Sequence, residues 1–263
     1  MSTDGSRTED SYRGWRKPGP IPAGAMSSPE PGPGETLDAL SGHYRIYQLK
    51  DGHRYSTDDV LVAWYGSSHA PRADTVLELG SGIGSVGMIA AWRLSGARFV
   101  TVEAQTESVA LARKLAVYNA LGDRYEIREG DFRAAGIIAA EERFDLVLGS
   151  PPYFPEGTGP MGDHPQKRAC RFELRGGIED YCQVAAKHLG PGAMFACVFP
   201  LEPPHQKARA LAAIRAAGLA IVRSRPVALK EGETPLLGLF LMAKAEDLPD
   251  AYRGEGYTEP PLV

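Results

Sequence analysis

The chain has 263 residues, of which 43% are hydrophobic and 24% charged, enough for one core domain with tails. A net charge of −4 argues against a strong nonspecific DNA-binding protein, although a local basic patch stays open. Three cysteines without CxxC spacing are typical of reduced thiols, so we expect a cytoplasmic protein without a metal site. No apolar stretch reaches the length of a membrane span or a signal peptide core, so we expect no membrane partner.

The two ends of the chain differ in composition from its middle. Residues 1–36 are rich in Ser, Pro, Gly and charge, which predicts a disordered tail. Residues 246–263 are again polar and Pro-rich, and we expect a second, polar tail there. The segment 37–245 between them is the predicted domain.

A hairpin and a helix are expected to form an arm at the start of this domain. Tyr44–Leu49 reads as a strand, and Asp51-Gly52 after it predicts a hairpin turn. Ser56 or Thr57 can then cap a helix, with two aspartates in its first turn.

Strands and helices alternate through the rest of the domain. This order predicts an α/β fold with a largely parallel sheet covered on both faces. The last two strands are joined by residues 229–234, which leave no room for a helix, so we expect an antiparallel hairpin there. The predicted strands are 74–79, 97–102, 125–127, 144–148, 193–199, 220–227 and 236–243, and the predicted helices are 85–94, 106–118, 178–189 and 204–217.

A glycine-rich turn follows the first of these strands. Gly80, Gly82 and Gly84 let a ligand approach the backbone at a helix N-terminus. Their GxGxG spacing misses the dinucleotide fingerprint GxGxxG. Glu78, just before the glycines, would repel a pyrophosphate but suits cationic groups, such as the ammonium and sulfonium of S-adenosylmethionine.

Polar and aromatic residues also end the next two strands. Glu103 follows the second strand, where a carboxylate can accept both hydroxyls of a ribose. Asp131 and Phe132 follow the third, and they can hold the amino group and the face of an adenine. Features of this kind at successive strand ends predict a nucleoside-containing cofactor.

The sequence Ser150-Pro151-Pro152-Tyr153 ends the fourth strand. Two prolines offer carbonyl acceptors without N–H donors, and the serine oxygen adds another acceptor. Acceptors beside an aromatic plane suit a planar ring that carries an NH₂ group. A rigid turn without a function is the alternative for this motif when it is taken alone.

With these motifs, residues 44–245 resemble the class I S-adenosylmethionine-dependent methyltransferases, and most of all the bacterial tRNA adenine-N6 methyltransferases that modify a valine tRNA. The resemblance implies a Rossmann-like, seven-stranded sheet with a reversed last strand. It implies S-adenosyl-L-methionine as cofactor, tRNA as partner, and Thr57 and Asp58 at the methionine end of the cofactor. The residues that carry it are Thr57-Asp58, Val60-Leu61, Glu78 to Gly84, Glu103, Gly130-Asp131 and Pro151 to Phe154.

One residue departs from that family, which normally has Asn where this chain has Ser150. Ser-Pro-Pro-Tyr is similar to the motif of cytosine-N4 DNA methyltransferases, so the target base stays open. We expect Ser150, which borders cofactor and acceptor alike, and a carbonyl near Pro151 to grip the two N–H bonds of an amine. Tyr153 and Phe154 would stack on the ring.

Several alternatives remain at this stage. Residues 155–173 predict a long loop, but a solvated loop of mixed charge fits as well as contact with RNA. The candidate contacts with phosphate, in the loop or just after it, are Lys167, Arg168, Arg171 and Arg175. The acceptor can instead be a protein glutamine amide or a small molecule. A cofactor-binding scaffold without catalysis is the non-enzyme alternative, and the oligomeric state stays open.

Overall fold

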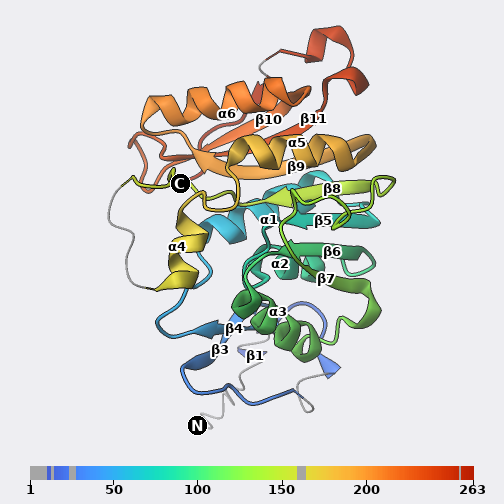
Figure 1. Cartoon of the computed structure of the whole chain (residues 1–263), viewed down its shortest axis with the longest axis vertical. Helices are drawn as coiled ribbons and strands as arrows, with labels where there is room; N and C mark the ends of the chain where they lie inside the picture. Colours follow the sequence, from blue (N-terminus) through green and yellow to red (C-terminus); the bar gives the residue numbers. More distant parts are fainter. Residues whose placement is uncertain (1–10, 13–14, 24–27, 159–163, 255) are drawn as a thin grey trace, which may run out of the picture.

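The computed structural model describes residues 11–12, 15–23, 28–158, 164–254 and 256–263. Within these ranges eight strands form one sheet, in the spatial order β12-β10-β11-β9-β8-β5-β6-β7 (Figure 1). In chain order they are β5 Thr75–Leu79, β6 Arg98–Glu103, β7 Tyr125–Glu129, β8 Phe144–Gly149, β9 Leu189–Pro200, β10 Leu219–Val227, β11 Leu237–Lys244 and β12 Tyr257–Thr258.

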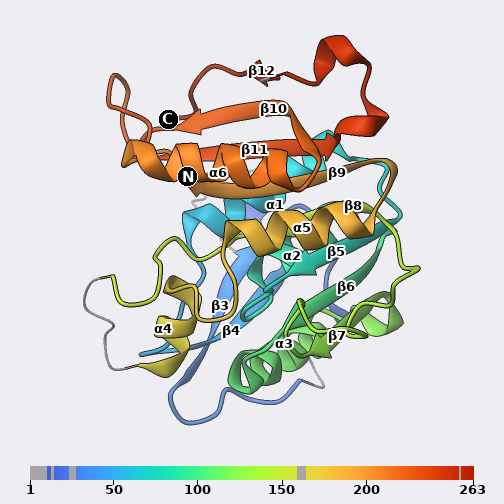
Figure 2. The ribbon, with the colours of Figure 1, turned by 45° about the horizontal axis from the view of Figure 1, so that its top comes forward.

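Helices cover both faces of this sheet. Side chains of α1, α2 and α3 join one buried cluster, and those of α5 and α6 join another on the opposite face (Figure 2). The helices are α1 Thr57–His69, α2 Ser85–Arg93, α3 Thr106–Tyr118, α4 Pro165–Arg171, α5 Ile178–His188 and α6 Pro204–Ala216. Across the described ranges, no helix has the length and apolar character needed to cross a membrane.

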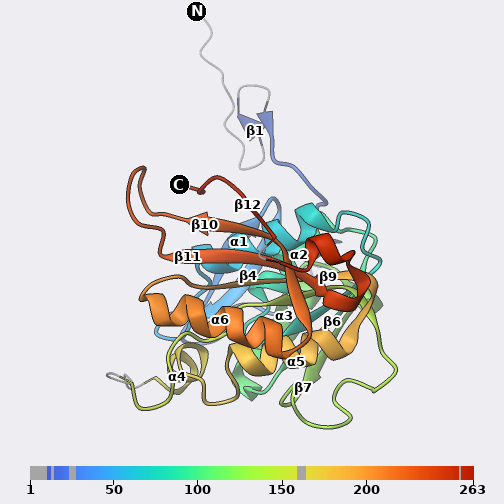
Figure 3. The same ribbon diagram turned by 90° about the horizontal axis from the view of Figure 1, so that it is seen from above.

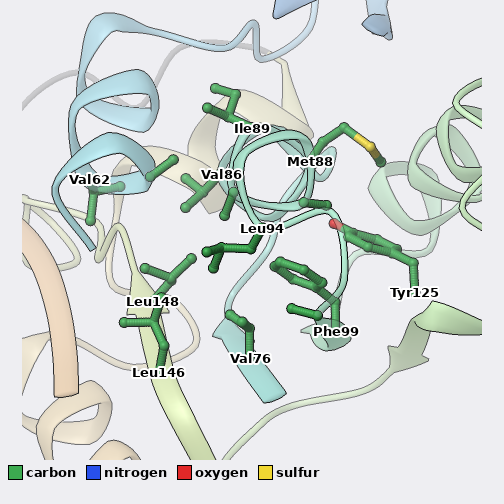
Figure 4. Close-up of a cluster of buried hydrophobic side chains, with 14 of the residues drawn as sticks. Val62, Val76, Val86, Met88, Ile89, Leu94, Phe99, Tyr125, Leu146 and Leu148 are labelled. Carbon is green, nitrogen blue, oxygen red and sulfur yellow. The ribbon is translucent and has the colours of Figure 1, made fainter. Parts of the chain in front are cut away.

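The alternation of side chains along β8 explains the two clusters. Leu146 and Leu148 belong to the cluster beneath α1 and α2, whereas Val147 belongs to the cluster beneath α5. Successive side chains of a strand point to opposite faces, so an uninterrupted apolar run is needed to fill both layers. Figure 4 shows the first cluster, in which Val86 and Ile89 of α2 lie over the sheet.

The topology confirms the predicted fold class. The strands β7, β6, β5, β8 and β9 are parallel, so their carboxyl ends meet at one edge of the sheet. β11 runs antiparallel to β9 and β10, as the reversed last strand of the prediction requires. The sheet has one strand more than predicted, because β12 pairs in parallel with β10 at the sheet edge. Two polar residues carry no pattern from which such a strand could be predicted.

The N-terminal hairpin exists, but its predicted turn is wrong. β4 Tyr44–Leu49 pairs with β3 Glu35–Ser41, which precedes it, and not with residues after Asp51-Gly52. Gly42 has a φ of 53° and supplies the positive dihedral angle that a two-residue hairpin turn needs. β3 therefore begins inside the tail predicted over residues 1–36.

Part of that predicted tail lies outside the described residues, and only part of the rest contacts the domain. β1 Ser11–Tyr12 pairs with β2 Trp15–Arg16. The hydroxyl of Tyr47 donates to the Pro29 carbonyl at 2.6 Å. The segment leading into β3 is thus held against the hairpin by a specific contact.

The C-terminal segment is anchored by Glu259. One oxygen of this carboxylate accepts from the hydroxyl of Tyr65 in α1 at 2.9 Å. Arg223 and Arg225 of β10 lie 3.6 and 3.5 Å from the same carboxylate. Figure 3 shows this segment passing along the edge of the sheet above α1. The residues after 246 are polar, as expected, and part of them is built into the fold.

Candidate active site

A cavity of about 340 Å³ lies where the parallel strands end. Most of the predicted site residues line it, so the fold brings the glycine turn and the Pro-Pro-Tyr motif together. Thr57, Gly84 and Arg168 are predicted site residues that do not line it. Those that do are Asp58, Glu78, Gly80, Gly82, Glu103, Asp131, Phe132, Ser150, Pro151, Pro152, Tyr153, Phe154 and Arg171.

The glycine turn joins β5 to α2, and its backbone has a conformation that residues with a side chain rarely adopt. Gly80 and Gly82 have φ angles of 62° and 55°, a region that L-residues other than glycine rarely adopt. A Cβ at Gly82 would meet no atom within 4 Å, which leaves open space for a ligand, whereas one at Gly80 would collide with the Tyr181 hydroxyl. Gly84 instead lets α2 pack on α3, since its Cβ would lie 3.2 Å from Leu115.

Glu103 connects the end of β6 to this turn. Its Oε2 accepts from the Gly82 backbone N–H at 2.7 Å, and its Oε1 accepts from that of Gln105 at 2.7 Å. Burial raises the pKa of this carboxyl, and the two backbone donors oppose the shift. Each oxygen keeps a free lone pair, so Glu103 can still accept from hydroxyl groups in the cavity.

Two more carboxylates lie deeper. Glu78 is 2% exposed, and its Oε2 has no partner among the described residues. Burial raises the pKa of Glu78 well above its ordinary value. Burial also raises the pKa of Asp59 from 3.8 to about 6, although Asp59 accepts from the Ser56 N–H at 3.1 Å and the Ser85 hydroxyl at 2.9 Å. A cationic group bound in the cavity would favour the ionised form of both.

Asp131 already has a partner on the other side of the cavity. Arg133 donates to both of its carboxylate oxygens, at 2.9 and 2.6 Å, and these bonds lower the pKa of Asp131. Phe132 is buried and meets Tyr181 edge to face, with ring centroids 4.7 Å apart. Asp131 can therefore receive an amino group only by sharing an oxygen with Arg133.

The Pro-Pro-Tyr motif extends from the end of β8 along the cavity wall. No hydrogen bond joins the Ser150 side chain to another residue of the described part of the chain, so its oxygen is available. The hydroxyl of Tyr153 donates to Asp58 Oδ2 at 2.6 Å. Burial, together with Asp58, raises the pKa of Tyr153 well above its ordinary value, which keeps this hydroxyl protonated. Phe154 is 42% exposed at the rim.

The described part of the segment after the motif, 155–158 and 164–173, is not all loop as predicted. It contains α4, and the Phe154 N–H and carbonyl bond to the backbone of Arg171 and Glu173, which closes residues 155–171 into a loop. Gln166, 1% exposed, accepts from the His53 N–H at 2.8 Å and donates to the Ser108 hydroxyl at 3.1 Å. α4 is thereby fastened beside the hairpin (Figure 2).

The basic residues of this segment separate into two kinds. Arg171 and Arg175 are exposed and line the cavity. Arg168 is half-buried, with an Nε that has no partner among the described residues. Of the predicted contacts with phosphate, Arg171 and Arg175 are therefore better placed than Arg168.

Sequence reasoning missed several residues of the cavity wall. They come from helices whose apolar spacing had predicted only core positions, or from segments between predicted elements. Asp59 was visible as a second aspartate in the first turn of a helix, but nothing in the spacing pointed it inward. Among the missed residues are His53, Asp59, Ser85, Cys170 and Tyr181.

Comparison with known proteins agrees with this geometry. Residues 64–160, which include the glycine turn and the Pro-Pro-Tyr motif, match the family model described as "Methyltransferase small domain". Over these residues the chain carries a methyltransferase domain. In fold it is similar to the crystal structure of a predicted O-methyltransferase from Agrobacterium tumefaciens, with a TM-score of 0.55 and 20% identity over 79% of this chain and 87% of that one.

Two curated proteins of known name are similar to this chain in sequence. It is 29% identical to a tRNA1(Val) (adenine(37)-N6)-methyltransferase of Shewanella amazonensis, over 78% of this chain and 85% of that protein. It is 32% identical to a release factor glutamine methyltransferase of Geobacter sulfurreducens, over 51% of this chain and 48% of that protein. The resemblance found from the motifs is confirmed, and the first relative extends it over most of the chain.

Proposed function

We propose that this methyltransferase binds S-adenosylmethionine in the cavity and methylates an exocyclic amine, adenine N6, in tRNA or another structured RNA. The observation that carries the proposal is that Ser150 and Tyr153 share one cavity with Gly82 and Glu103. A methyl donor and an amine acceptor must lie within contact distance for direct transfer. The similarity to the Shewanella protein, named for adenine methylation in tRNA, supports the choice of acceptor.

The residues present fit this cofactor. Its nucleoside end fits Glu103 and Phe132, and its amino acid end fits Asp58 and the open space above Gly82. One buried oxygen on the wall, Ser81 Oγ, has no protein partner in the described part of the chain. Unpartnered buried polar atoms are costly, and a cationic, polar ligand would offset that cost.

When bound, S-adenosylmethionine supplies an electrophilic methyl group with a good leaving group. The task of the protein is then to orient the amine. Ser150 Oγ and a carbonyl of the motif accept its N–H bonds and aim the nitrogen lone pair, and the flat face of Tyr153 holds the ring. Positioning, not a strong base, therefore supplies most of the rate.

The rim of the cavity supports an RNA acceptor. Phe154 offers an exposed ring for stacking, and the backbone of Arg171 is bonded to it. Arg171 and Arg175 add exposed cations to the cavity wall. Aromatic side chains with nearby arginines suit unpaired bases and their phosphates. A base in an RNA loop is already exposed, whereas a duplex base would first have to be flipped.

The second candidate is methylation of a protein glutamine amide. Its support is the Geobacter relative, which matches about half of each chain. Both acceptors carry a planar NH₂ group, so the grip on the amine does not separate them. The exposed Phe154 and the rim arginines favour a nucleobase.

The test is transfer of tritiated methyl groups from labelled cofactor to separate pools of RNA, DNA, protein and metabolites. We expect label in tRNA that was purified from cells lacking this enzyme, and N6-methyladenosine after digestion. Tyr153→Ala should lower this transfer by on the order of tenfold or more, because stacking contributes about 1–3 kcal/mol. Tyr252→Ala, at a residue 68% exposed and absent from the cavity wall, is the matched control. Label in protein or metabolites alone would overturn the proposal.

A further inference from the structure

We propose that Asp58 is a positioning residue that holds the Tyr153 ring in place for the acceptor base. The proposal deepens the proposed function, on which it rests. It gives Asp58 a role beyond the one implied by resemblance, which places it at the methionine end of the cofactor. The observation that carries it is the 2.6 Å hydrogen bond from the Tyr153 hydroxyl to Asp58 Oδ2.

Tyr153 is held at three points by three different elements. Its hydroxyl bonds to Asp58 in the first turn of α1. Its ring meets Phe199 of β9 edge to face, with centroids 5.8 Å apart. Its carbonyl accepts from Gln206 Nε2 of α6 at 2.9 Å. Phe199 and Gln206 are both buried, so two of the three anchors belong to the rigid interior.

The three anchors control different degrees of freedom. The hydroxyl lies on the axis about which the ring turns, so the bond to Asp58 fixes where the ring points. The edge contact with Phe199 fixes the plane of the ring about that axis. Without Asp58 the ring keeps its packing partner but can swing about χ1, and a stacking face that swings loses preorganisation.

The neighbouring carboxylate does not share this role. Asp59 accepts from Ser56 and Ser85 and fastens the start of α1 to α2. In contrast, Asp58 Oδ1 accepts no hydrogen bond from any residue that the structure describes. Asp58 is thus held chiefly by Tyr153, and the pair links the helix that borders the cofactor side to the ring that borders the acceptor side.

Three variants isolate this bond. Tyr153→Phe keeps the ring and removes the donor. Asp58→Ala removes the acceptor, and Asp58→Asn keeps an amide oxygen that can accept while it removes the charge. Tyr65→Phe is the matched control, since it breaks a part-buried tyrosine–carboxylate bond of 2.9 Å, to Glu259, and neither residue lines the cavity.

For methyl transfer to the tRNA pool, we expect kcat to fall about tenfold in Tyr153→Phe and in Asp58→Ala, the equivalent of about 1.4 kcal/mol. At saturating S-adenosylmethionine, Asp58→Asn should lose less kcat than Asp58→Ala, because its amide oxygen can still accept from the Tyr153 hydroxyl. The double variant Asp58→Ala/Tyr153→Phe should be no slower than either single variant, because both remove one shared bond. In Tyr153→Phe, the Kd for S-adenosylmethionine measured by calorimetry should stay within about twofold of wild type. Additive losses, or a loss in Asp58→Asn as large as in Asp58→Ala, would overturn the proposal.

A second measurement needs no activity. With 3-fluorotyrosine in place of Tyr153, the fluorine beside the hydroxyl reports the bond to Asp58 by NMR. We expect Asp58→Ala to shift and broaden this resonance, and Tyr65→Phe to leave it unchanged. If the resonance ignores Asp58→Ala, Asp58 does not hold the ring. If it responds while the wild-type protein methylates no RNA, the proposed function fails and the assignment of Asp58 as the holder of Tyr153 survives.

Discussion

Ser150 has a short hydroxyl where the similar tRNA-modifying family has the longer carboxamide of Asn. The hydroxyl lies at the end of β8, on the wall of the cavity, with Pro151 buried behind it. Both side chains offer an acceptor oxygen, but a carboxamide reaches about one bond further. If the proposed function is correct, Ser150 keeps an acceptor for the N–H of the amine and changes the depth at which that amine binds.

Replacement of Ser150 tests this acceptor directly. We expect Ser150→Ala to lower the single-turnover rate of methyl transfer about tenfold, since one aligned hydrogen bond is worth about 0.5–1.5 kcal/mol. Ser150→Asn should restore a rate close to wild type. Equal rates in the wild type and the alanine variant would show that the hydroxyl does not touch the amine.

Asp59 makes stability depend on pH. Its pKa in the folded protein is about 6, raised by burial from the ordinary 3.8, so between these values the folded protein holds a proton that the unfolded chain has released. The contribution of Asp59 to the free energy of unfolding therefore falls as pH rises from about 4 to 6 and stays lower above that window. We expect Asp59→Asn to flatten this part of the curve by about 1–3 kcal/mol, measured by urea unfolding at several pH values. Glu78 is present in both the wild type and the variant and serves as an internal control. If the free energy of unfolding depends on pH identically in the two proteins, Asp59 does not cause this dependence.

At the scale of elements, α4 is the piece that closes the cavity from the side of the hairpin. Its only deeply buried residue among those described is Gln166, which bonds to the segment after β4 and to α3. A short helix that is anchored by the hydrogen bonds of one buried polar residue has few apolar contacts. We therefore expect α4 to open locally without global unfolding.

Gln166→Ala should therefore loosen α4 selectively. We expect faster amide hydrogen exchange over 165–171 and weaker binding of S-adenosylmethionine, with little change in exchange along β5 and β8. Lys167→Ala, at an exposed neighbour on the same helix, is the matched control. If hydrogen exchange over 165–171 stays as slow in Gln166→Ala as in the wild type, other contacts hold α4 in place.

The elements also show what the sequence could predict. The strands and helices of the core were predictable because apolar runs and 3.6-residue spacing leave little choice at buried positions. β3, α4 and β12 were not, since each is held by a few specific contacts, such as those of Gln166 and Glu259, rather than by a periodic apolar face. The motif residues of the cavity were predictable because they form short local sequence patterns at strand ends. Asp59 and Tyr181 belong to no such pattern, and only the packing of their helices brings them to the cavity.

At the scale of the whole molecule, Glu259 joins the last residues of the chain to the first helix of the domain. Its carboxylate serves Tyr65 of α1 and two arginines of β10. Because β12 also pairs with β10, the segment covers a sheet edge that would otherwise expose unpaired backbone groups.

Removal of this anchor should destabilise the fold without changing the site. We expect Glu259→Ala to lower the free energy of unfolding by about 2 kcal/mol, because it leaves a buried hydroxyl and two guanidinium groups without their partner. Urea denaturation should show a lower midpoint at an unchanged slope. Glu246→Ala, at an exposed position of the same segment, should leave the midpoint within experimental error.

The backbone bridge between Phe154 and Phe172 has a consequence for how such enzymes diversify. It joins the two ends of residues 155–171 to each other. This segment, called the cassette below, is therefore an insertion that leaves the domain and returns to it at one point. Exchange of the cassette between related chains should transplant acceptor preference while the nucleoside-facing half stays intact. Replacement of this one segment would then be a sufficient route to a new acceptor during evolution.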